Sequence, residues 1–212
     1  MYKANQSLTE RAYKKEKGDR NFTLFLAIVF LLMITIFIFT RFVYINVRVD
    51  GPSMNPTLSS GDVLFANKNA VPEAGDIIVI DGEKVSEDGS GYDLLIKRAI
   101  AIGQKDKTII VQIINNRIWV GDSDKTMMPL SEDYFDEDKL TEPRSDIVRW
   151  ELNEGDIFYL GDNRENSKDS RSEYGTCKIN QVVGVVPEWS LSTRWLSGFI
   201  YDLGQFFANL FR

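Results

Sequence analysis

Residues 22–40 read FTLFLAIVFLLMITIFIFT, and this uncharged stretch divides the 212-residue chain into unequal parts. At about 1.5 Å rise per residue, a helix of this length spans roughly 28 Å, near the thickness of the hydrocarbon core of a bilayer. A cleaved secretory signal is the alternative, but its apolar region runs about 7 to 15 residues and ends at a small-residue site. Thr40-Arg41-Phe42-Val43 has no such pattern. We therefore predict a retained transmembrane helix over residues 22–41.

The charges on either side of this stretch predict its orientation. Residues 1–21 carry six basic and three acidic side chains, a net charge of +3, whereas residues 42–212 carry a net charge of −10. Positive residues stay on the cytoplasmic side of a membrane. We therefore predict a single-pass protein of the plasma membrane, with a cytoplasmic tail over residues 1–21 and the remainder outside. Because the outer part is acidic, nucleic acid is excluded as a partner.

Residues 42–194 carry the patterns of β-strands. Tyr44–Asp50 alternates apolar and polar side chains, and residues 109–114 and 117–120 flank Asn115-Asn116 as the strands of a hairpin flank a turn. A Gly-Asp pair precedes each of three further apolar runs, at Gly61-Asp62, Gly75-Asp76 and Gly155-Asp156. A turn followed by an apolar run is typical of a strand. We predict a mainly β domain, and the pairing of its strands stays open.

Three segments fall outside the strand pattern. Residues 84–92 (KVSEDGSGY) and 131–140 (SEDYFDEDKL) read as polar surface insertions. The second is acidic but lacks the spacing of a calcium loop, so we interpret it as a solvated loop. Residues 195–212 (WLSGFIYDLGQFFANLFR) are rich in aromatic residues and interrupted by polar ones. An amphipathic helix on membrane lipid is the favoured interpretation, with packing against the β domain as the alternative.

The chain has no histidine and a single cysteine, Cys177. The lone cysteine excludes an intrachain disulfide and a cysteine-rich zinc site, and we interpret it as a partly buried thiol. The absence of histidine excludes Ser-His-Asp and Cys-His catalysis and histidine-based zinc hydrolases. A serine nucleophile in this chain would therefore need a different base.

A serine and a lysine are candidates for such a pair. Ser53 lies in the turn-like stretch GPSMNPTL, residues 51–58, just beyond the predicted anchor. Lys97 lies within the apolar run of residues 93–102, on the same strand face as Leu95. Burial favours the neutral amine, which can act as a general base. A lysine that reaches water beside Arg98 is the alternative, and this run alone does not decide between them.

The polar run of residues 161–171, GDNRENSKDSR, favours the first interpretation. It combines short hydroxyl, amide and oppositely charged side chains after a predicted strand. Ser167 could hold a lysine amine in line, and Asp169 and Arg171 could pair to fix the loop.

These three stretches resemble the signature boxes of type I signal peptidases, membrane-anchored serine proteases with a Ser/Lys dyad. Residues 51–58 are similar to the nucleophile box S-M-x-P-T, residues 96–98 to the lysine box, and residues 161–171 to the G-D-N-x-x-x-S-x-D-S-R box. Residues 61–80 resemble the box between the first two. The resemblance covers most of residues 44–186, is closest to Gram-positive members, and implies antiparallel β-sheets with an apolar surface towards the membrane.

The resemblance implies roles for individual residues. Ser53 would be the nucleophile and Lys97 the general base, with Ser167 hydrogen-bonded to Lys97. The Ser53 backbone amide would supply part of the oxyanion hole. Gly51 stands where some members carry a serine that helps to bind the oxyanion. The residues expected to hold the last box in place are Asp162, Asp169 and Arg171. Those expected to border the oxyanion or the substrate are Gly51, Val49, Met54, Leu58, Leu95 and Ile96.

The resemblance also implies an activity. The substrate would be the signal peptide of an exported preprotein, cut after a small residue of an A-x-A site, without a metal or an organic cofactor. One departure lies after the lysine box, where residues 103–106 (GQKD) replace the usual Pro-Gly-Asp turn. A catalytically silent assembly factor or chaperone is the alternative, although such a protein would be expected to lose the serine or the lysine. The oligomeric state stays open.

Overall fold

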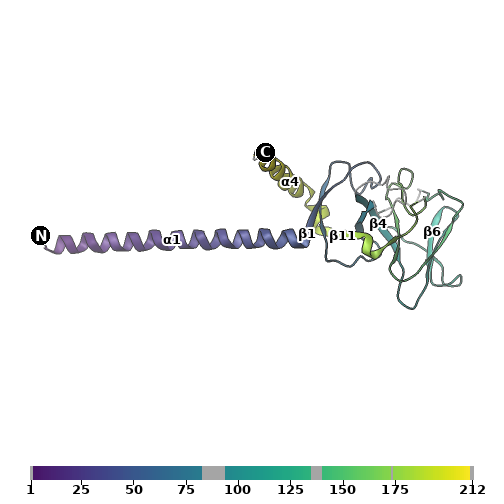
Figure 1. Ribbon diagram of the computed structural model, residues 1–212, viewed down its shortest axis with the longest axis horizontal. Coiled ribbons are helices and arrows are strands. Elements are labelled where there is room, and N and C mark those ends of the chain that lie inside the picture. The colour runs from purple at the N-terminus through teal and green to yellow at the C-terminus, as the bar shows by residue number, and fades with distance from the viewer. Residues whose placement is uncertain (1, 83–93, 135–139, 173, 211–212) are drawn as a thin grey trace. The chain divides into compact units, whose positions relative to one another are not determined.

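The computed structural model describes residues 2–82, 94–134, 140–172 and 174–210 (Figure 1). The insertion predicted at residues 84–92 lies outside the described residues. The chain separates into two compact units, Met1–Val43 and Tyr44–Arg212.

The first unit is a single helix, α1, over Tyr2–Val43. Its segment Asp19–Val43 is long and apolar enough to cross a membrane, and no other helix among the described residues is. This agrees with a membrane anchor near the N-terminus. The helix begins well before the predicted span, because few residues of the preceding polar segment disfavour a helix.

The second unit is built mainly from antiparallel strands, as predicted. A seven-stranded sheet has the order β1-β2-β11-β3-β4-β9-β10, and all its pairs are antiparallel. Its strands are β1 (Tyr44–Arg48), β2 (Val63–Asn67), β3 (Ile77–Asp81), β4 (Leu94–Ile102), β9 (Asp156–Leu160), β10 (Cys177–Lys178) and β11 (Val182–Val186). A short 3-10 helix, η1 (Ile179–Gln181), joins the last two.

A second sheet of four strands has the order β7-β6-β5-β8. Its strands are β5 (Ile109–Ile114), β6 (Arg117–Gly121), β7 (Met128–Pro129) and β8 (Arg149–Leu152). The predicted hairpin is confirmed, because β5 and β6 pair across the turn Asn115-Asn116. Both asparagines have positive φ, 51° and 59°, as the central residues of a type I′ turn must.

The three Gly-Asp pairs start strands β2, β9 and β3 by the same local structure. Each glycine has a φ between 79° and 98°, a conformation that glycine adopts without a steric cost. Each aspartate carboxylate accepts a hydrogen bond of 2.8–3.0 Å from the backbone N–H three positions earlier. The turn is thereby closed by the side chain, and the prediction of strands after these pairs is confirmed.

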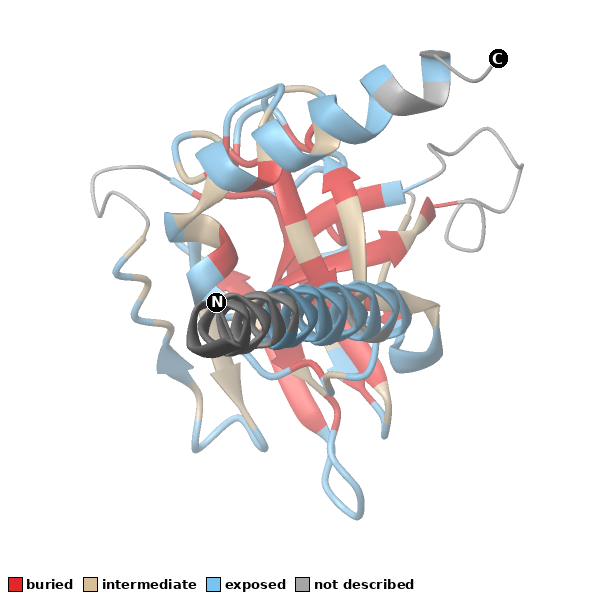
Figure 2. Cartoon of the chain, turned by 90° about the vertical axis from the view of Figure 1, so that its left-hand side faces the viewer, coloured by how far each residue is buried: buried red, intermediate tan, exposed pale blue. Residues whose placement is uncertain are grey.

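Most strands of the second unit are buried (Figure 2), and β4 is buried on both faces from Leu95 to Ala101. Leu95 and Ala99 pack in one hydrophobic cluster, Ile96 in a second and Ile100 in a third. Polar groups are strongly desolvated in such a setting.

Two helices follow the sheet, α3 (Glu188–Ser192) and α4 (Arg194–Leu210). The Ser190 hydroxyl at the buried side of α3 accepts a hydrogen bond of 2.8 Å from the Phe65 backbone N–H in β2. This bond satisfies a backbone donor of the strand and fixes α3 against the sheet.

Candidate active site

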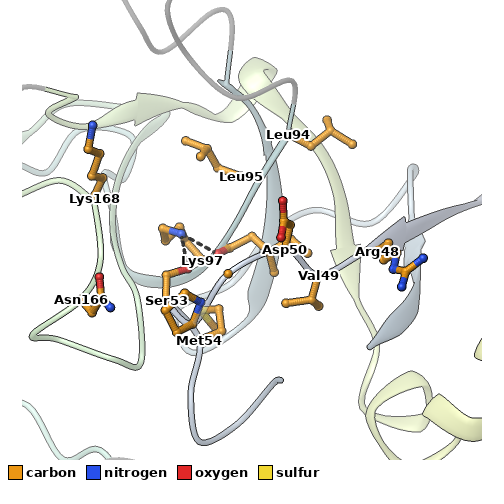
Figure 3. Close-up of a pocket in the computed structure, with 13 residues that line it drawn as sticks. Arg48, Val49, Asp50, Ser53, Met54, Leu94, Leu95, Lys97, Asn166 and Lys168 are labelled. Carbon is orange, nitrogen blue, oxygen red and sulfur yellow. Dashed lines mark hydrogen bonds between the residues drawn. The ribbon is translucent and has the colours of Figure 1, made fainter. Parts of the chain in front are cut away.

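Ser53 and Lys97 lie in direct contact although 44 positions separate them in the chain. Lys97 Nζ donates a hydrogen bond of 2.8 Å to Ser53 Oγ and a second of 3.0 Å to the Ile96 carbonyl (Figure 3). Only 4% of Lys97 is exposed. The interpretation of Lys97 as a surface lysine is therefore wrong, because both faces of β4 are covered.

The environment of Lys97 favours its neutral form. Burial lowers the pKa of Lys97 from 10.5 to about 8, while the carboxylates of Asp169 and Asp162 act in the opposite direction. An amine with a pKa of about 8 is neutral in about a tenth of the molecules at pH 7 and in about half of them at pH 8, far more than an exposed lysine. The lone pair of the neutral amine can accept the proton of Ser53 Oγ.

The turn that carries Ser53 is fixed mainly by backbone contacts to the polar run 161–171. The Asn163 backbone N–H donates to the Ser53 carbonyl at 3.0 Å, and Asn163 Nδ2 donates to the Pro52 carbonyl at 3.1 Å. Met54 is buried in a hydrophobic cluster beside the pair. Gly51 has a φ of +83°, which explains a glycine at this position. The role of Asn163 was not predicted, since the residue was seen only as part of a polar run.

Asp162 is the centre of a buried ionic group. The Arg98 guanidinium donates two hydrogen bonds to its carboxylate, at 2.9 and 2.6 Å, and the Thr57 hydroxyl donates a third at 2.5 Å. Arg98 also donates to the Gly75 carbonyl at 2.8 Å. Asp162 thus connects the lysine strand to the turn that carries the nucleophile. The sequence offered no signal that Arg98 would be its partner.

The predicted pair of Asp169 and Arg171 is confirmed. The Arg171 guanidinium donates two hydrogen bonds of 2.9 Å to the Asp169 carboxylate, and both side chains are almost completely buried. Arg171 also donates to the carbonyls of Arg164 and Glu142, at 2.8 and 3.0 Å. The Gly161 backbone N–H donates to Asp169 at 3.2 Å. The polar run is therefore a compact, internally bonded loop.

The expected hydrogen bond between Ser167 and Lys97 does not form in this structure. Ser167 Oγ is buried without a hydrogen-bond partner, because Lys97 Nζ is directed to Ser53 Oγ and to the Ile96 carbonyl. Ser167 packs against Gly161 instead: a Cβ on that glycine would lie 2.3 Å from Ser167 Oγ and 2.4 Å from the Ser53 carbonyl oxygen. A role of Ser167 in orienting Lys97 stays a prediction.

The interpretation of residues 131–140 as a solvated loop is wrong for part of the loop. Glu132 forms a buried ion pair with Arg164, and the Tyr134 hydroxyl donates to Glu132 at 2.7 Å. The Tyr134 ring lies 3.6 Å from the Arg98 guanidinium. Burial, followed by the Glu132 carboxylate, raises the pKa of Tyr134. Residues 135–139 lie outside the described part. This part of the loop is buried because Arg164, 32 positions further along the chain, neutralises the Glu132 carboxylate, and because Arg98 packs on the Tyr134 ring.

Metal chemistry and thiol chemistry find no support in the described residues. No group of three His, Cys, Asp or Glu side chains among them is arranged to hold a metal ion. Cys177 is more buried than predicted, and burial raises the pKa of its thiol to about 12. A thiol in this environment is not a nucleophile at neutral pH.

A cleft of about 250 Å³ opens over Ser53 and Lys97 (Figure 3). On one side lie Val49 and Gly51, and on the other Leu95 and Ile96. The complete lining is Arg48, Val49, Asp50, Gly51, Pro52, Ser53, Met54, Leu94, Leu95, Ile96, Lys97, Asn166 and Lys168. Leu58 was predicted to border the substrate but does not line the cleft. It lies in the hydrophobic core, fully buried, because its backbone N–H bonds to the Met54 carbonyl at 2.9 Å and turns the chain inwards.

Comparisons with known proteins show the family of this chain. Residues 21–189 match the family described as signal peptidase, peptidase S26. Signal peptidase I from Bacillus caldolyticus is 33% identical over 186 residues, which cover 82% of this chain and 91% of the relative. Signal peptidase I T from Bacillus subtilis (strain 168) is 29% identical over 192 residues, 87% of this chain and 92% of the relative.

Among solved structures, the crystal structure of a signal peptidase I from Enterococcus faecalis V583 aligns with 55% of this chain and 97% of its own length. The identity is 23% and the TM-score 0.38. The assignment rests on the family match and on the sequence relatives, which confirm the resemblance seen in the three boxes. This chain belongs to the signal peptidase family, peptidase S26.

Proposed function

We propose that this protein is a membrane-anchored serine endopeptidase that removes signal peptides from exported preproteins. The observation that carries the proposal is the 2.8 Å contact between Lys97 Nζ and Ser53 Oγ in a buried setting. Membership of the signal peptidase family supports the substrate class. The silent alternative is disfavoured, because a protein without catalysis has no need to keep a desolvated lysine against a serine hydroxyl.

The chemistry is acyl transfer. Neutral Lys97 accepts the proton of Ser53 Oγ as this oxygen attacks the scissile carbonyl carbon. The C–N bond then breaks, Lys97 returns the proton to the leaving amine, and the signal peptide remains as an ester on Ser53. Lys97 next accepts a proton from a water molecule that attacks the ester. The C–O bond to Ser53 then breaks, Lys97 returns the proton to Ser53 Oγ, and the signal peptide leaves with a free carboxyl end. The Ser53 backbone amide is the proposed donor to the oxyanion.

The cleft favours an extended peptide with small side chains. Strand β9 pairs with β4 only from Arg98 onwards, so one edge of the backbone at Leu95 and Ile96 borders the cleft. A substrate could add to this edge as a further strand. Alternate side chains would then point towards the apolar groups of Val49 and Met54, which line the cleft of about 250 Å³. This arrangement supports cleavage after an A-x-A site.

The location of the site follows from the anchor. We propose that α1 crosses the plasma membrane with residues 1–21 in the cytoplasm, since basic side chains gather there. The catalytic domain would then lie outside, where exported preproteins emerge. Enzyme and substrate would both be held at one surface, which raises their effective concentration.

The test is cleavage of a purified preprotein by the full chain in detergent. Ser53→Ala and Lys97→Ala should each lose cleavage completely, and Lys97→Arg should fail as well, because a guanidinium does not release its proton at these pH values. Ser59→Ala and Lys125→Ala are matched controls. Both residues are exposed, and both variants should cleave as the parent does.

Two outcomes would count against the proposal. Cleavage by Lys97→Ala at the parental rate would remove Lys97 as the base. An intact, folded parent protein that cleaves no preprotein would favour the silent assembly factor. Folding of each variant is checked by circular dichroism, so that a loss of activity is not mistaken for a loss of structure.

A further inference from the structure

Helix α4 (Arg194–Leu210) lies outside residues 21–189, the part that matches the family. Its apolar residues recur at a spacing that places them on one face of a helix. In the structure these residues are exposed, with 74% of Trp195 and 61% of Phe199 accessible to solvent. The C-terminal helix is drawn mostly in the colour of exposed residues in Figure 2. We call this face the apolar stripe and define it by six residues, Trp195, Leu196, Phe199, Ile200, Leu203 and Phe206.

The rest of α4 is attached to the catalytic domain. Arg194 Nη1 donates to Asp62 Oδ2 at 2.8 Å and to the Thr57 carbonyl at 3.1 Å. Ser197 is fully buried, and α4 contacts strand β2. The helix therefore has an inner side fixed to the domain and an outer side that carries the apolar stripe. A contiguous exposed apolar patch of this kind marks an interaction surface.

The start of α4 lies close to the point where the chain leaves the proposed anchor. The apolar segment Asp19–Val43 ends one residue before Tyr44, the first residue of β1. The Tyr44 ring packs edge-on against Trp189 of α3 at 5.6 Å, and only Thr193 separates α3 from α4. Chain connectivity thus keeps the root of α4 near the bilayer that the anchor spans.

We propose that α4 lies on the membrane surface, with the apolar stripe inserted at the boundary between lipid headgroups and acyl chains. Aromatic residues such as Trp195 and Phe199 favour this boundary. A second protein chain is a poorer fit, since a stable interface takes about 20 to 30 residues a side and the stripe has six described residues. The inference rests on the proposed membrane anchorage and adds a second attachment to it.

Docking of α4 has a consequence for the active site. Arg194 joins the helix to Thr57, and the Thr57 hydroxyl donates to Asp162 beside the site. A docked α4 would therefore hold the turn with Ser53 at a constant height above the lipid. Because the orientation of the domain would be fixed, the scissile bond of a membrane-held preprotein would reach Ser53 at a lower cost in rotational entropy.

The test measures the depth of α4 in vesicles. The full chain with Cys177→Ala is given one new cysteine, Phe199→Cys in the stripe or Gln205→Cys on the opposite, exposed face, and is labelled with an environment-sensitive fluorophore. It is reconstituted in vesicles of phosphatidylcholine and phosphatidylglycerol. Nitroxide on the lipid acyl chains should quench the label at 199 at least about threefold more than at 205, and aqueous iodide should show the reverse preference.

Two results would overturn the inference. Equal quenching by iodide at both positions would place α4 in water. Protection of position 199 from iodide without quenching by the lipid nitroxide would assign the stripe to a protein contact, either a second copy or another chain. The measurement needs no catalysis and should give the same result in Ser53→Ala. A failure of docking is therefore distinguishable from a failure of the proposed peptidase function.

A second measurement tests the consequence for the substrate. The double variant Phe199→Asp, Leu203→Asp should cleave a membrane-embedded preprotein in vesicles at least about tenfold more slowly, because carboxylates resist insertion. It should cleave a short soluble peptide at the parental rate. The control Gln205→Asp adds a carboxylate on the opposite, exposed face of the helix and should leave both rates unchanged. Equal rates of the stripe variant and the parent on the embedded substrate would contradict the consequence.

Discussion

Replacing Lys97 by methionine should abolish cleavage and yet stabilise the folded domain at neutral pH. Methionine has nearly the same length as lysine and brings no charge into the buried space between Ser53 and the Ile96 carbonyl. Natural proteins often keep such a destabilising group at an active site because the reaction needs it. The stability of the variant therefore reports the desolvation of Lys97 separately from its chemistry.

The magnitude follows from the pKa of Lys97, which burial lowers from 10.5 to about 8. At about 1.4 kcal/mol per pH unit, burial of the charged amine costs about 3 kcal/mol below pH 8. The two hydrogen bonds of Lys97 Nζ contribute about 1 to 2 kcal/mol in the opposite direction. Lys97→Met should thus raise the free energy of unfolding at pH 7 by about 1 to 2 kcal/mol.

The sign of this difference should change with pH. Between pH 8 and 10.5 the unfolded chain binds more protons at Lys97 than the folded chain, so the stability of the parent rises with pH. Above about pH 10.5 the cost of burying the charge is gone, and the variant should be less stable by the lost hydrogen bonds, about 1 to 2 kcal/mol. Other lysines and tyrosines titrate in both proteins and cancel in the difference.

The assay is urea unfolding of the full chain in detergent, followed by tryptophan fluorescence at pH values from about 7 to 11. All four tryptophans lie in residues 44–212, so the signal reports the catalytic domain. Lys125→Met, at an exposed position, is the control and should show no change with pH. A constant difference between Lys97→Met and the parent across this range would refute the argument that Lys97 is desolvated.

Three further predictions concern the site. The kcat/KM of the parent should rise with pH and level off above about 8, because only neutral Lys97 acts as a base, and a profile that stays flat from pH 6 to 9 would contradict this. Gly161→Ala should lower kcat at least about tenfold, because its Cβ would come within 2.4 Å of the Ser53 carbonyl oxygen. Steady-state kinetics measure this effect, and urea unfolding checks that the variant is as stable as the parent. Asp162→Asn should lower the free energy of unfolding by about 3 to 5 kcal/mol by leaving Arg98 buried without its partner, and it should move the pH profile to lower pH. Urea unfolding and a kcat/KM profile measure the two effects.

Much of the fold could be predicted because its signals are local. A Gly-Asp pair contains in two residues both the positive φ and the carboxylate that close the turn before a strand. The hairpin at Asn115-Asn116 and the anchor at residues 22–41 are equally local patterns. The sheet order was not predictable, since strands β2 and β11 are more than a hundred positions apart.

The candidate site divides in the same way. Ser53 and Lys97 could be paired because the absence of histidine required another base, and because the polar run 161–171 and the resemblance to type I signal peptidases favoured a buried Lys97. The pairing of Arg164 with Glu132 could not be predicted, because opposite charges 32 positions apart in polar segments carry no directional signal. Ser167 shows the limit of a resemblance: its type and position agree with the family pattern, but its hydroxyl makes no hydrogen bond in this structure.

The arginines around the site explain how Lys97 can have a pKa near 8 with two carboxylates nearby. Unpaired, the carboxylates of Asp162 and Asp169 would stabilise the charged amine and oppose the effect of burial. Arg98 and Arg171 each bind one of them through two hydrogen bonds, and a bound guanidinium opposes the field of its carboxylate at Lys97. Desolvation therefore remains the dominant effect on the amine. We therefore expect the buried ion pairs to have a function besides stability: they allow a rigid polar loop with two carboxylates to lie beside Lys97 while its pKa stays well below that of an exposed lysine.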